Sequence, residues 1–230
     1  MDALQLRTRN KAEIRALILN TARASFVHEG YESFSLRRLA RQIGYSPAAL
    51  YRHFRDKDEI FSCLTEESFD ALVKASSAVV PEPGEDPVSV LKRGMHAYVK
   101  FGLENPDHYR FAFLVHGRES KPPRRPRAAY QALRIRIIRC IEAGRFHPLD
   151  PDLLAQSLWA ATHGVTSLLV QRPAFPWVRK GKLVSRVIDS AVDALDCGNR
   201  RPSSGGHNGS SADAGKSYRH AQPKAPRALR

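Results

Sequence analysis

The segment Phe34-Ser-Leu-Arg-Arg-Leu-Ala-Arg-Gln-Ile-Gly-Tyr-Ser-Pro-Ala-Ala-Leu-Tyr-Arg-His-Phe-Arg-Asp-Lys57 decides the fold of this chain. The first apolar residues of this segment recur at helical spacing, at Leu36, Leu39, Ala40 and Ile43. An apolar stripe with this spacing predicts a helix with one buried face. Gly44 can adopt the positive φ that ends a helix. Ser46 and Pro47 are then typical of an N-cap and a first helical residue. The segment predicts two helices joined by a short turn, whose second helix can lie in the major groove of DNA.

The second helix of this motif is expected to be apolar on one side and polar on the other. Leu50 and Phe54 would point into the core. The open side would carry small, aromatic and cationic residues, namely Ala48, Ala49, Tyr51, Arg52, His53 and Lys57. Small residues let the backbone approach base edges, and the longer side chains suit phosphates. An ordinary pair of packed helices would explain the buried stripe and the caps, with Ser35 as the first cap, but not this open side.

These motifs resemble the N-terminal DNA-binding domain of the TetR family of repressors. The matching positions are Gly30-Tyr31, Ser35, Arg37-Arg38-Leu39-Ala40, Gly44-Tyr45-Ser46 and Leu50-Tyr51-Arg52-His53-Phe54-Arg55-Asp56-Lys57. The resemblance implies that the bases are faced by Arg37, Pro47, Ala48 and Ala49. It implies that phosphates are contacted by Ser35, Ser46, Tyr51, His53 and Lys57. Ala48 and Ala49 depart from the Gly, Lys or Thr of many members and offer only methyl contact with thymine, so Arg37 and DNA shape would carry more of the readout.

Composition limits the class of protein. The chain has 230 residues and a formal net charge of +14, which suits a polyanionic partner, either nucleic acid or an anionic membrane surface. Cys63, Cys140 and Cys197 are far apart and odd in number, so neither a disulfide framework nor a metal site is indicated, and no cofactor is expected. The sequence has no Gly-x-Ser-x-Gly, Walker or His-Glu-x-x-His motif, so we expect no enzyme.

The location of the protein follows from two further patterns. No apolar run is expected to reach the roughly 18 residues of a membrane span. The first residues, Met1-Asp-Ala-Leu-Gln-Leu-Arg-Thr-Arg, lack the apolar core of a signal peptide. We therefore expect a cytoplasmic protein without a membrane segment.

An all-α chain with four parts is predicted. Residues 8–56 would form the three-helix DNA-binding domain, residues 57–80 a connecting helix, residues 85–196 a C-terminal domain, and residues 197–230 a disordered basic tail. Breakers in Pro81–Pro87 mark the domain boundary, and Gly117–Pro126 is expected to be a loop. The expected helices cover residues 8–28, 56–77, 88–104, 107–115, 127–146, 151–171 and 183–195.

The C-terminal domain resembles one group of TetR-family C-terminal domains through Trp159-Ala-Ala-Thr-His163-Gly164 and Asn105-Pro106-x-x-Tyr109-Arg110-x-x-Phe113. The resemblance implies that the last two long helices pair with their copies as a four-helix dimer interface. The candidate interface residues are Leu158, Ala161, Val165, Leu169, Val184, Val187, Ile188 and Ala191. The segment 151–171 is apolar nearly all round, which independently predicts burial on two sides.

A ligand pocket is the expected companion of this domain. Its candidate residues are Met95, Tyr98, Phe101, Phe111, Phe113, Trp159 and His163, with His96 and His116 as polar anchors. Aromatic residues with a few polar groups suit a small, partly apolar effector. The same stripe at helical spacing is also typical of an ordinary core.

We expect a regulator that binds a palindromic double-stranded operator as a homodimer and releases it when a small-molecule effector enters the C-terminal domain. Two alternatives stay open. One is a DNA-binding activator or architectural protein without an effector. The other is a basic helical protein that binds RNA or a membrane surface through its tail and the segment 117–145.

Overall fold

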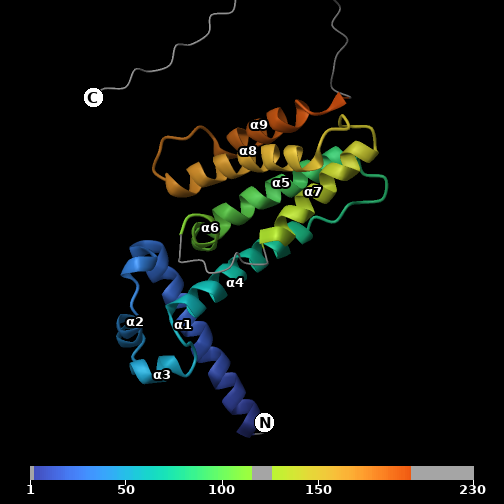
Figure 1. Cartoon of the computed structure of the whole chain (residues 1–230). Coiled ribbons are helices and arrows are strands. Elements are labelled where there is room, and N and C mark those ends of the chain that lie inside the picture. Colours follow the sequence, from blue (N-terminus) through green and yellow to red (C-terminus); the bar gives the residue numbers. More distant parts are fainter. Residues whose placement is uncertain (1–2, 116–125, 198–230) are drawn as a thin grey trace, which may run out of the picture. The chain divides into compact units, whose positions relative to one another are not determined.

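The computed structural model describes the backbone of residues 3–115 and 126–197 and the side chains of residues 11–115 and 128–197. Within these ranges the chain is helical and has no strand, which confirms the predicted all-α fold (Figure 1). Its helices are α1 Ala3–Ser33, α2 Leu36–Gln42, α3 Pro47–Tyr51, α4 Lys57–Ser77, α5 Pro87–Glu104, α6 Pro106–Phe113, α7 Pro126–Glu142, α8 Pro151–Gln171 and α9 Lys180–Asp193. The predicted loop at 117–126 and the predicted tail at 197–230 lie almost wholly outside the described residues.

The turn between α2 and α3 follows the local signals of the sequence. Gly44 has φ +73°. The N–H of Tyr45 donates to the Ala40 carbonyl at 2.9 Å and that of Gly44 to the Arg41 carbonyl at 3.3 Å, which together form a Schellman ending. Ser46 then caps α3, because its hydroxyl accepts from the Ala49 N–H at 3.2 Å.

One predicted cap is wrong. The Ser35 side chain makes no capping hydrogen bond to α2, although its backbone carbonyl accepts from the Leu39 N–H at 2.9 Å. The Ser35 backbone is extended, with φ −136°, and its side chain is exposed to solvent. In contrast, the Asp56 carboxylate caps α4 by accepting from the Glu59 N–H at 2.8 Å.

The first helix is longer than the predicted segment 8–28, since α1 covers Ala3–Ser33. Gly30 interrupts it with φ 78° and ψ 168°, so the expected stop at this glycine appears as a kink with one further turn beyond it. That turn brings the Tyr31 and Phe34 side chains back onto Phe26, whose ring centroid lies 4.0 Å from that of Phe34. The kink therefore closes the apolar core of the first three helices.

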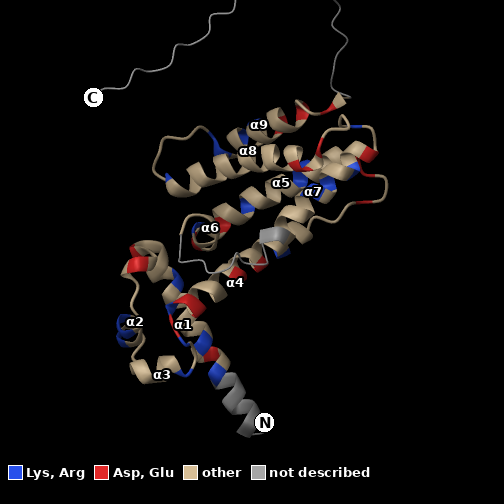
Figure 2. Cartoon of the chain, in the orientation of Figure 1, with Lys and Arg blue, Asp and Glu red and all other residues tan. Residues whose placement is uncertain are grey.

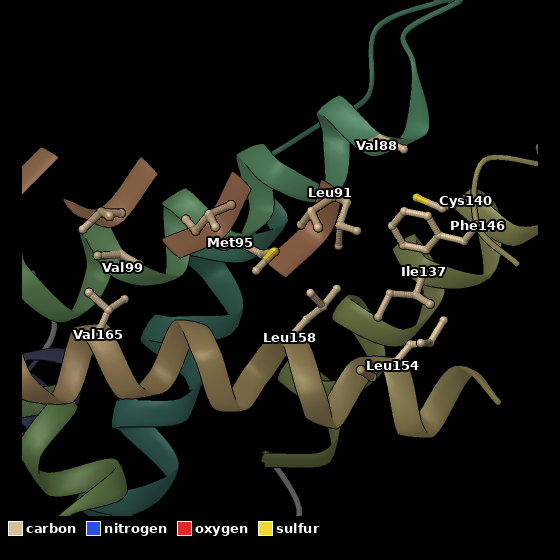
Figure 3. Close-up of a cluster of buried hydrophobic side chains, with 14 of the residues drawn as sticks. Val88, Leu91, Met95, Val99, Ile137, Cys140, Phe146, Leu154, Leu158 and Val165 are labelled. Atoms are coloured by element: carbon tan, nitrogen blue, oxygen red, sulfur yellow. The ribbon is translucent and has the colours of Figure 1, made fainter. Parts of the chain in front are cut away.

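Two large apolar cores organise the described residues. The first, which we call the head core, joins α1 to α4 and contains Ile18, Ala22, Phe26, Leu39, Leu50, Phe54, Ile60 and Leu64. The second, the body core, joins α5, α7, α8 and α9. Figure 3 shows part of the body core, in which Leu158 and Val165 of α8 face Met95 and Val99 of α5. The head core holds the helix–turn–helix in shape, and the body core holds the C-terminal helices together. We call the part built from α1 to α4 the head and the part built from α5 to α9 the body.

The α8 helix has few charges over its 21 residues, and it is long and apolar enough, by length and composition alone, to cross a membrane. The expectation that no run reaches this length is therefore wrong for α8. Its buried side chains pack in the body core against α5, α7 and α9. The core of a folded domain accounts for this apolar character.

Candidate nucleic-acid interface and internal cavity

The helix–turn–helix presents an open face with the expected residues. Leu50 and Phe54 are buried, as predicted. The exposed residues are Ser35, Arg37, Ser46, Pro47, Ala48, Tyr51 and Arg52, and Ala49 is half-buried. Tyr51 keeps 52% of its surface in solvent, although it is a large aromatic residue. In Figure 2 the arginines lie on α2 whereas α3 carries no charged residue, so a cationic helix lies next to a neutral one.

His53 and Lys57 lie closer to the protein than the sequence predicted. The Lys57 ammonium sits 4.1 Å from the centroid of the Tyr31 ring and donates to the Tyr31 carbonyl at 3.2 Å. His53 is half-buried, and its Nδ1 is buried without a hydrogen-bond partner among the described residues. Burial lowers the pKa of His53, and the nearby cations Lys11, Arg15 and Arg52 lower it further. The His53 side chain is therefore neutral near pH 7 and can form hydrogen bonds without contributing a charge.

Arg15 of α1 holds the segment that joins α3 to α4, a role that the sequence did not indicate. Its guanidinium donates to the His53 carbonyl at 2.8 Å and to the Cys63 Sγ at 3.2 Å. The Arg15 Cζ atom also lies 4.0 Å from the centroid of the Phe54 ring. These contacts join α1 to the corner between α3 and α4. An arginine on a long helix with several other charged residues gives no signal in the sequence that singles it out for these contacts.

A cavity of about 190 Å³ lies between α4 and the body, where residues of α4, α5, α6, α7 and α8 line it. Its lining residues are mostly apolar and aromatic, namely Phe69, Leu72, Ser76, Leu91, Gly94, Met95, Tyr98, Phe113, Ala129, Tyr130, Leu133, Arg136, Trp159 and Thr162. This volume is somewhat larger than an engineered apolar cavity of about 150 Å³ that binds benzene. The cavity therefore has room for a single ring with a short substituent or for a short alkyl chain.

The candidate pocket residues divide into two groups. Met95, Tyr98, Phe113 and Trp159 line the cavity. Phe101, Phe111 and His163 do not: Phe101 packs on Phe69 and Leu72, and Phe111 lies in the head core. His96 is half-buried away from the cavity, and His116 lies outside the described residues. The sequence did not predict the cavity-lining residues of α4 and α7, because both helices also contain apolar residues that belong to the ordinary core.

His163 adjoins the cavity through a hydrogen-bonded pair of tyrosines. The Tyr98 hydroxyl lies 2.9 Å and the Tyr109 hydroxyl 2.7 Å from His163 Nδ1. Burial lowers the pKa of His163 and raises the pKa of Tyr98 to about 12. Burial also raises the pKa of Tyr109. All three groups are therefore neutral near pH 7, which suits an apolar cavity.

The candidate dimer-interface residues divide into two groups. The structure packs Leu158, Val165, Leu169, Val184 and Ile188 in the body core of the same chain, which leaves little of their surface for a second copy. Ala161, Val187 and Ala191 are half-buried. A different row on α8 is open to solvent and consists of Leu153, Ser157, Ala160 and Leu168, with the half-buried Gly164 among them. A helix that is apolar nearly all round does not reveal from its sequence which face turns inward.

The three cysteines are free thiols in the described part of the chain, and no metal-ligand cluster of His, Cys, Asp and Glu occurs there. Burial raises the pKa of Cys140 to about 12 and also raises that of Cys63. Protonated thiols are poor nucleophiles.

Comparison with known proteins finds a matching family for each of the two parts of the chain. Residues 18–63 match the family described as "Bacterial regulatory proteins, tetR family", and residues 91–195 match the family described as "Tetracyclin repressor-like, C-terminal domain". The HTH-type transcriptional repressor Rv1474c of Mycobacterium tuberculosis is 40% identical over 63 residues. That alignment covers 27% of this chain and 34% of the relative, so it concerns about a third of that protein.

Solved structures extend the likeness to the whole described fold. The TetR family transcriptional regulator PfmR from Thermus thermophilus is 26% identical with a TM-score of 0.64, over 76% of this chain and 97% of PfmR. A bacterial regulatory protein in the tetR family from Rhodococcus RHA1 shares the fold with a TM-score of 0.67 at 21% identity, over 80% of this chain and 97% of that protein. With two family matches along one chain and a shared fold, the protein belongs to the TetR family of DNA-binding transcriptional regulators and is not an enzyme.

Proposed function

We propose that the chain is a ligand-responsive repressor that binds a palindromic operator as a homodimer and releases it when a small molecule occupies the internal cavity. The observation that carries this proposal is the position of α4. Its N-terminus follows the reading helix α3, and its residues Phe69, Leu72 and Ser76 line the cavity. A ligand that favours a different position of α4 therefore changes the presentation of α3.

The open face of the helix–turn–helix supplies the DNA contacts in this proposal. Arg37 reads base edges from α2, and the small residues Ala48 and Ala49 let α3 approach the groove. Tyr51 and Arg52 reach phosphates from the exposed side of α3. Lys57 contacts a phosphate from its place over the Tyr31 ring, where its ammonium is already oriented.

A second copy of the chain completes the operator-binding unit. The row Leu153, Ser157, Ala160, Gly164 and Leu168 repeats every three to four residues along α8, as one face of a helix does. Leu153 is 59% and Leu168 52% exposed. Burial of this row, together with the half-buried Val187 and Ala191 of α9, forms a four-helix interface with the same helices of the partner.

Polar contacts connect the head to the body, and through them ligand binding in the cavity can affect the DNA-binding face. Arg23 of α1 lies 3.0 Å from His108 Nε2 of α6 and 2.7 Å from the Glu67 carboxylate of α4. His108 Nδ1 lies 3.3 Å from the Ser68 hydroxyl, again on α4. A displacement of α4 or α6 therefore changes contacts on α1, which packs directly against the helix–turn–helix.

Selection of bound DNA from a random pool tests the proposal. We expect an inverted repeat with half-sites about one helical turn, or a multiple, apart. Replacing Tyr51 and Lys57 with Ala should abolish binding to that sequence. Replacing Lys182 with Ala, at an exposed position of α9, removes the same single charge away from α3 and serves as the control. Recovery of no repeat, or unchanged binding by the Tyr51/Lys57 variant, would contradict the proposal.

A further inference from the structure

One cationic side chain lies in the otherwise neutral lining of the cavity. Arg136 of α7 is the charged residue among the side chains that line it, and its neighbours there are aliphatic, aromatic or hydroxyl-bearing. Burial lowers the pKa of Arg136, and the like charges of Arg139 and Arg93 lower it further. Since an arginine stays protonated even so, the cavity holds a fixed positive charge.

Within the described part of the chain, Arg136 lacks the carboxylate partner that comparable arginines have. Among the described residues of the body, the half-buried Arg110 pairs with Asp107, Arg134 with Asp152, and Arg145 with Asp86 and Asp196. Arg136 instead donates to two backbone carbonyls, to that of Ser76 at 2.8 Å and to that of Ala132 at 3.3 Å. These bonds use two of its five N–H donors. A partly desolvated cation without an anion is unfavourable, and a bound anion would compensate it.

The surrounding helices are shaped around this guanidinium. A Cβ atom at Gly94 of α5 would lie 3.2 Å from Nε and 3.3 Å from Cζ of Arg136, so the glycine leaves the space that the guanidinium fills. The cavity then follows α5 from Leu91 and Gly94 to Tyr98, a distance of about 10 Å along the helix. Phe69, Phe113 and Trp159 line it together with Tyr98. A cationic group and an aromatic region therefore share one small cavity.

We propose that the effector is an amphiphilic carboxylate, whose carboxylate pairs with Arg136 and whose apolar part lies against the aromatic side chains. This inference rests on the ligand-responsive function proposed above. It also specifies the switch. Arg136 ties α7 to the last turn of α4 through the Ser76 carbonyl. A carboxylate competes for the same N–H donors, so its binding weakens this tie and frees the end of α4.

A charge series of ligands tests the inference on the unmodified full chain. The probes are octanoate with octanamide and octylamine, and 4-phenylbutyrate with its amide, and isothermal titration calorimetry measures their dissociation constants. Each carboxylate should bind about tenfold or more tightly than its amide, which corresponds to about 1.4 kcal/mol. Octylamine, a cation at pH 7, should bind weakest. Equal or tighter binding of the amides, or no binding of either carboxylate, would overturn the inference.

Variants of the arginine provide a second measurement. Arg136→Gln should remove the preference for the carboxylate over the amide, and Arg136→Lys should keep the preference with lower affinity. Arg186→Gln removes the same charge from an exposed position of α9, away from the cavity lining, and should leave both affinities unchanged. Circular dichroism confirms that each variant is folded. A carboxylate preference that survives in folded Arg136→Gln would overturn the assignment.

Operator release, followed by fluorescence anisotropy of the selected DNA, separates this inference from the function on which it rests. Release by octanoate or 4-phenylbutyrate, lost in Arg136→Gln, supports both. Carboxylate binding that depends on Arg136 but leaves operator affinity unchanged would contradict ligand-responsive repression and leave the site standing. Release caused equally by the neutral amides would overturn the carboxylate inference and leave the repressor function standing.

Discussion

The ring of Phe111, from α6 in the body, lies 5.7 Å from the ring of Phe26, from α1 in the head, in an edge-to-face arrangement. The same Phe111 ring lies 4.9 Å from that of Phe61 of α4. Its side chain is 1% exposed and belongs to the head core, although α6 belongs in sequence to the C-terminal half. The head therefore folds around a residue that the body supplies, and the two halves are physically coupled at this ring.

Phe111→Ala should lower the free energy of unfolding by about 3–5 kcal/mol, because it removes a fully buried aromatic ring from the head core. The loss of stability should be greatest in the head. Operator affinity should therefore decrease at temperatures at which the body is still folded. Urea unfolding followed by circular dichroism measures the first effect. Leu103→Ala, at a more exposed apolar position of α5, is the control and should change the free energy of unfolding by less than about 1 kcal/mol.

Arg37→Ala should weaken operator binding by about 1–3 kcal/mol and relax the preference at the base pair that Arg37 reads. The reason is that α3 offers Pro47, Ala48 and Ala49, none of which has a side-chain hydrogen bond for a base. Anisotropy titrations of the selected operator and of single-base variants measure both effects. Arg186→Ala, at an exposed arginine of α9, should leave both unchanged. If Arg37→Ala discriminates between base variants as well as the unmodified protein does, DNA shape rather than Arg37 provides the readout.

The sequence predicted where a helix begins or ends correctly at positions where a single residue determines the backbone conformation. Asp150 and Pro151 set the start of α8 and a proline at 173 follows its end, and the predicted segment 151–171 matches the helix at both ends. Gly44 ends α2 for the same reason, since few other residues adopt φ +73°. The prediction that Ser35 caps α2 was wrong because its hydroxyl is exposed and can bind water instead of the helix N-terminus. A serine near the start of a helix does not by itself fix the rotamer of its side chain.

The cavity was harder to predict because it depends on which face of each helix turns inward. On α7 arginine and isoleucine alternate closely, with Arg134, Ile135, Arg136 and Ile137 in succession. The structure buries Ile137 and directs Arg136 to the cavity, whereas Ile135 is 48% exposed. Packing against α4 and α5 determines which side chains of α7 turn inward, and helical spacing alone does not predict it. The same reason explains why five core residues of α8 and α9 were expected at a dimer interface.

Leu168→Arg should convert the proposed dimer to a monomer, because it places a charge at the C-terminal end of the exposed row of α8 that we propose for the interface. Sedimentation velocity measures the change in mass, and binding to the full inverted repeat should weaken while each single half-site is bound as before. Ile135→Arg makes the same replacement at an exposed apolar residue of α7, outside the row, and should stay dimeric. A dimeric Leu168→Arg protein would place the interface elsewhere.

Acidification should destabilise the protein through three half-buried histidines. Burial lowers the folded-state pKa of His53, His108 and His163, so the unfolded chain binds protons more readily than the folded one. The free energy of unfolding should therefore be highest above the unfolded pKa of about 6.5 and fall as the pH decreases below it. His108 shows the cause directly, because Arg23 donates to its Nε2 at 3.0 Å and a protonated ring would repel that guanidinium. Urea unfolding at pH 7.5 and pH 5.5 measures the difference, and His108→Asn should reduce it. His147→Asn, at an exposed histidine, is the control, and an equal reduction in both variants would show that the contact with Arg23 is not the source.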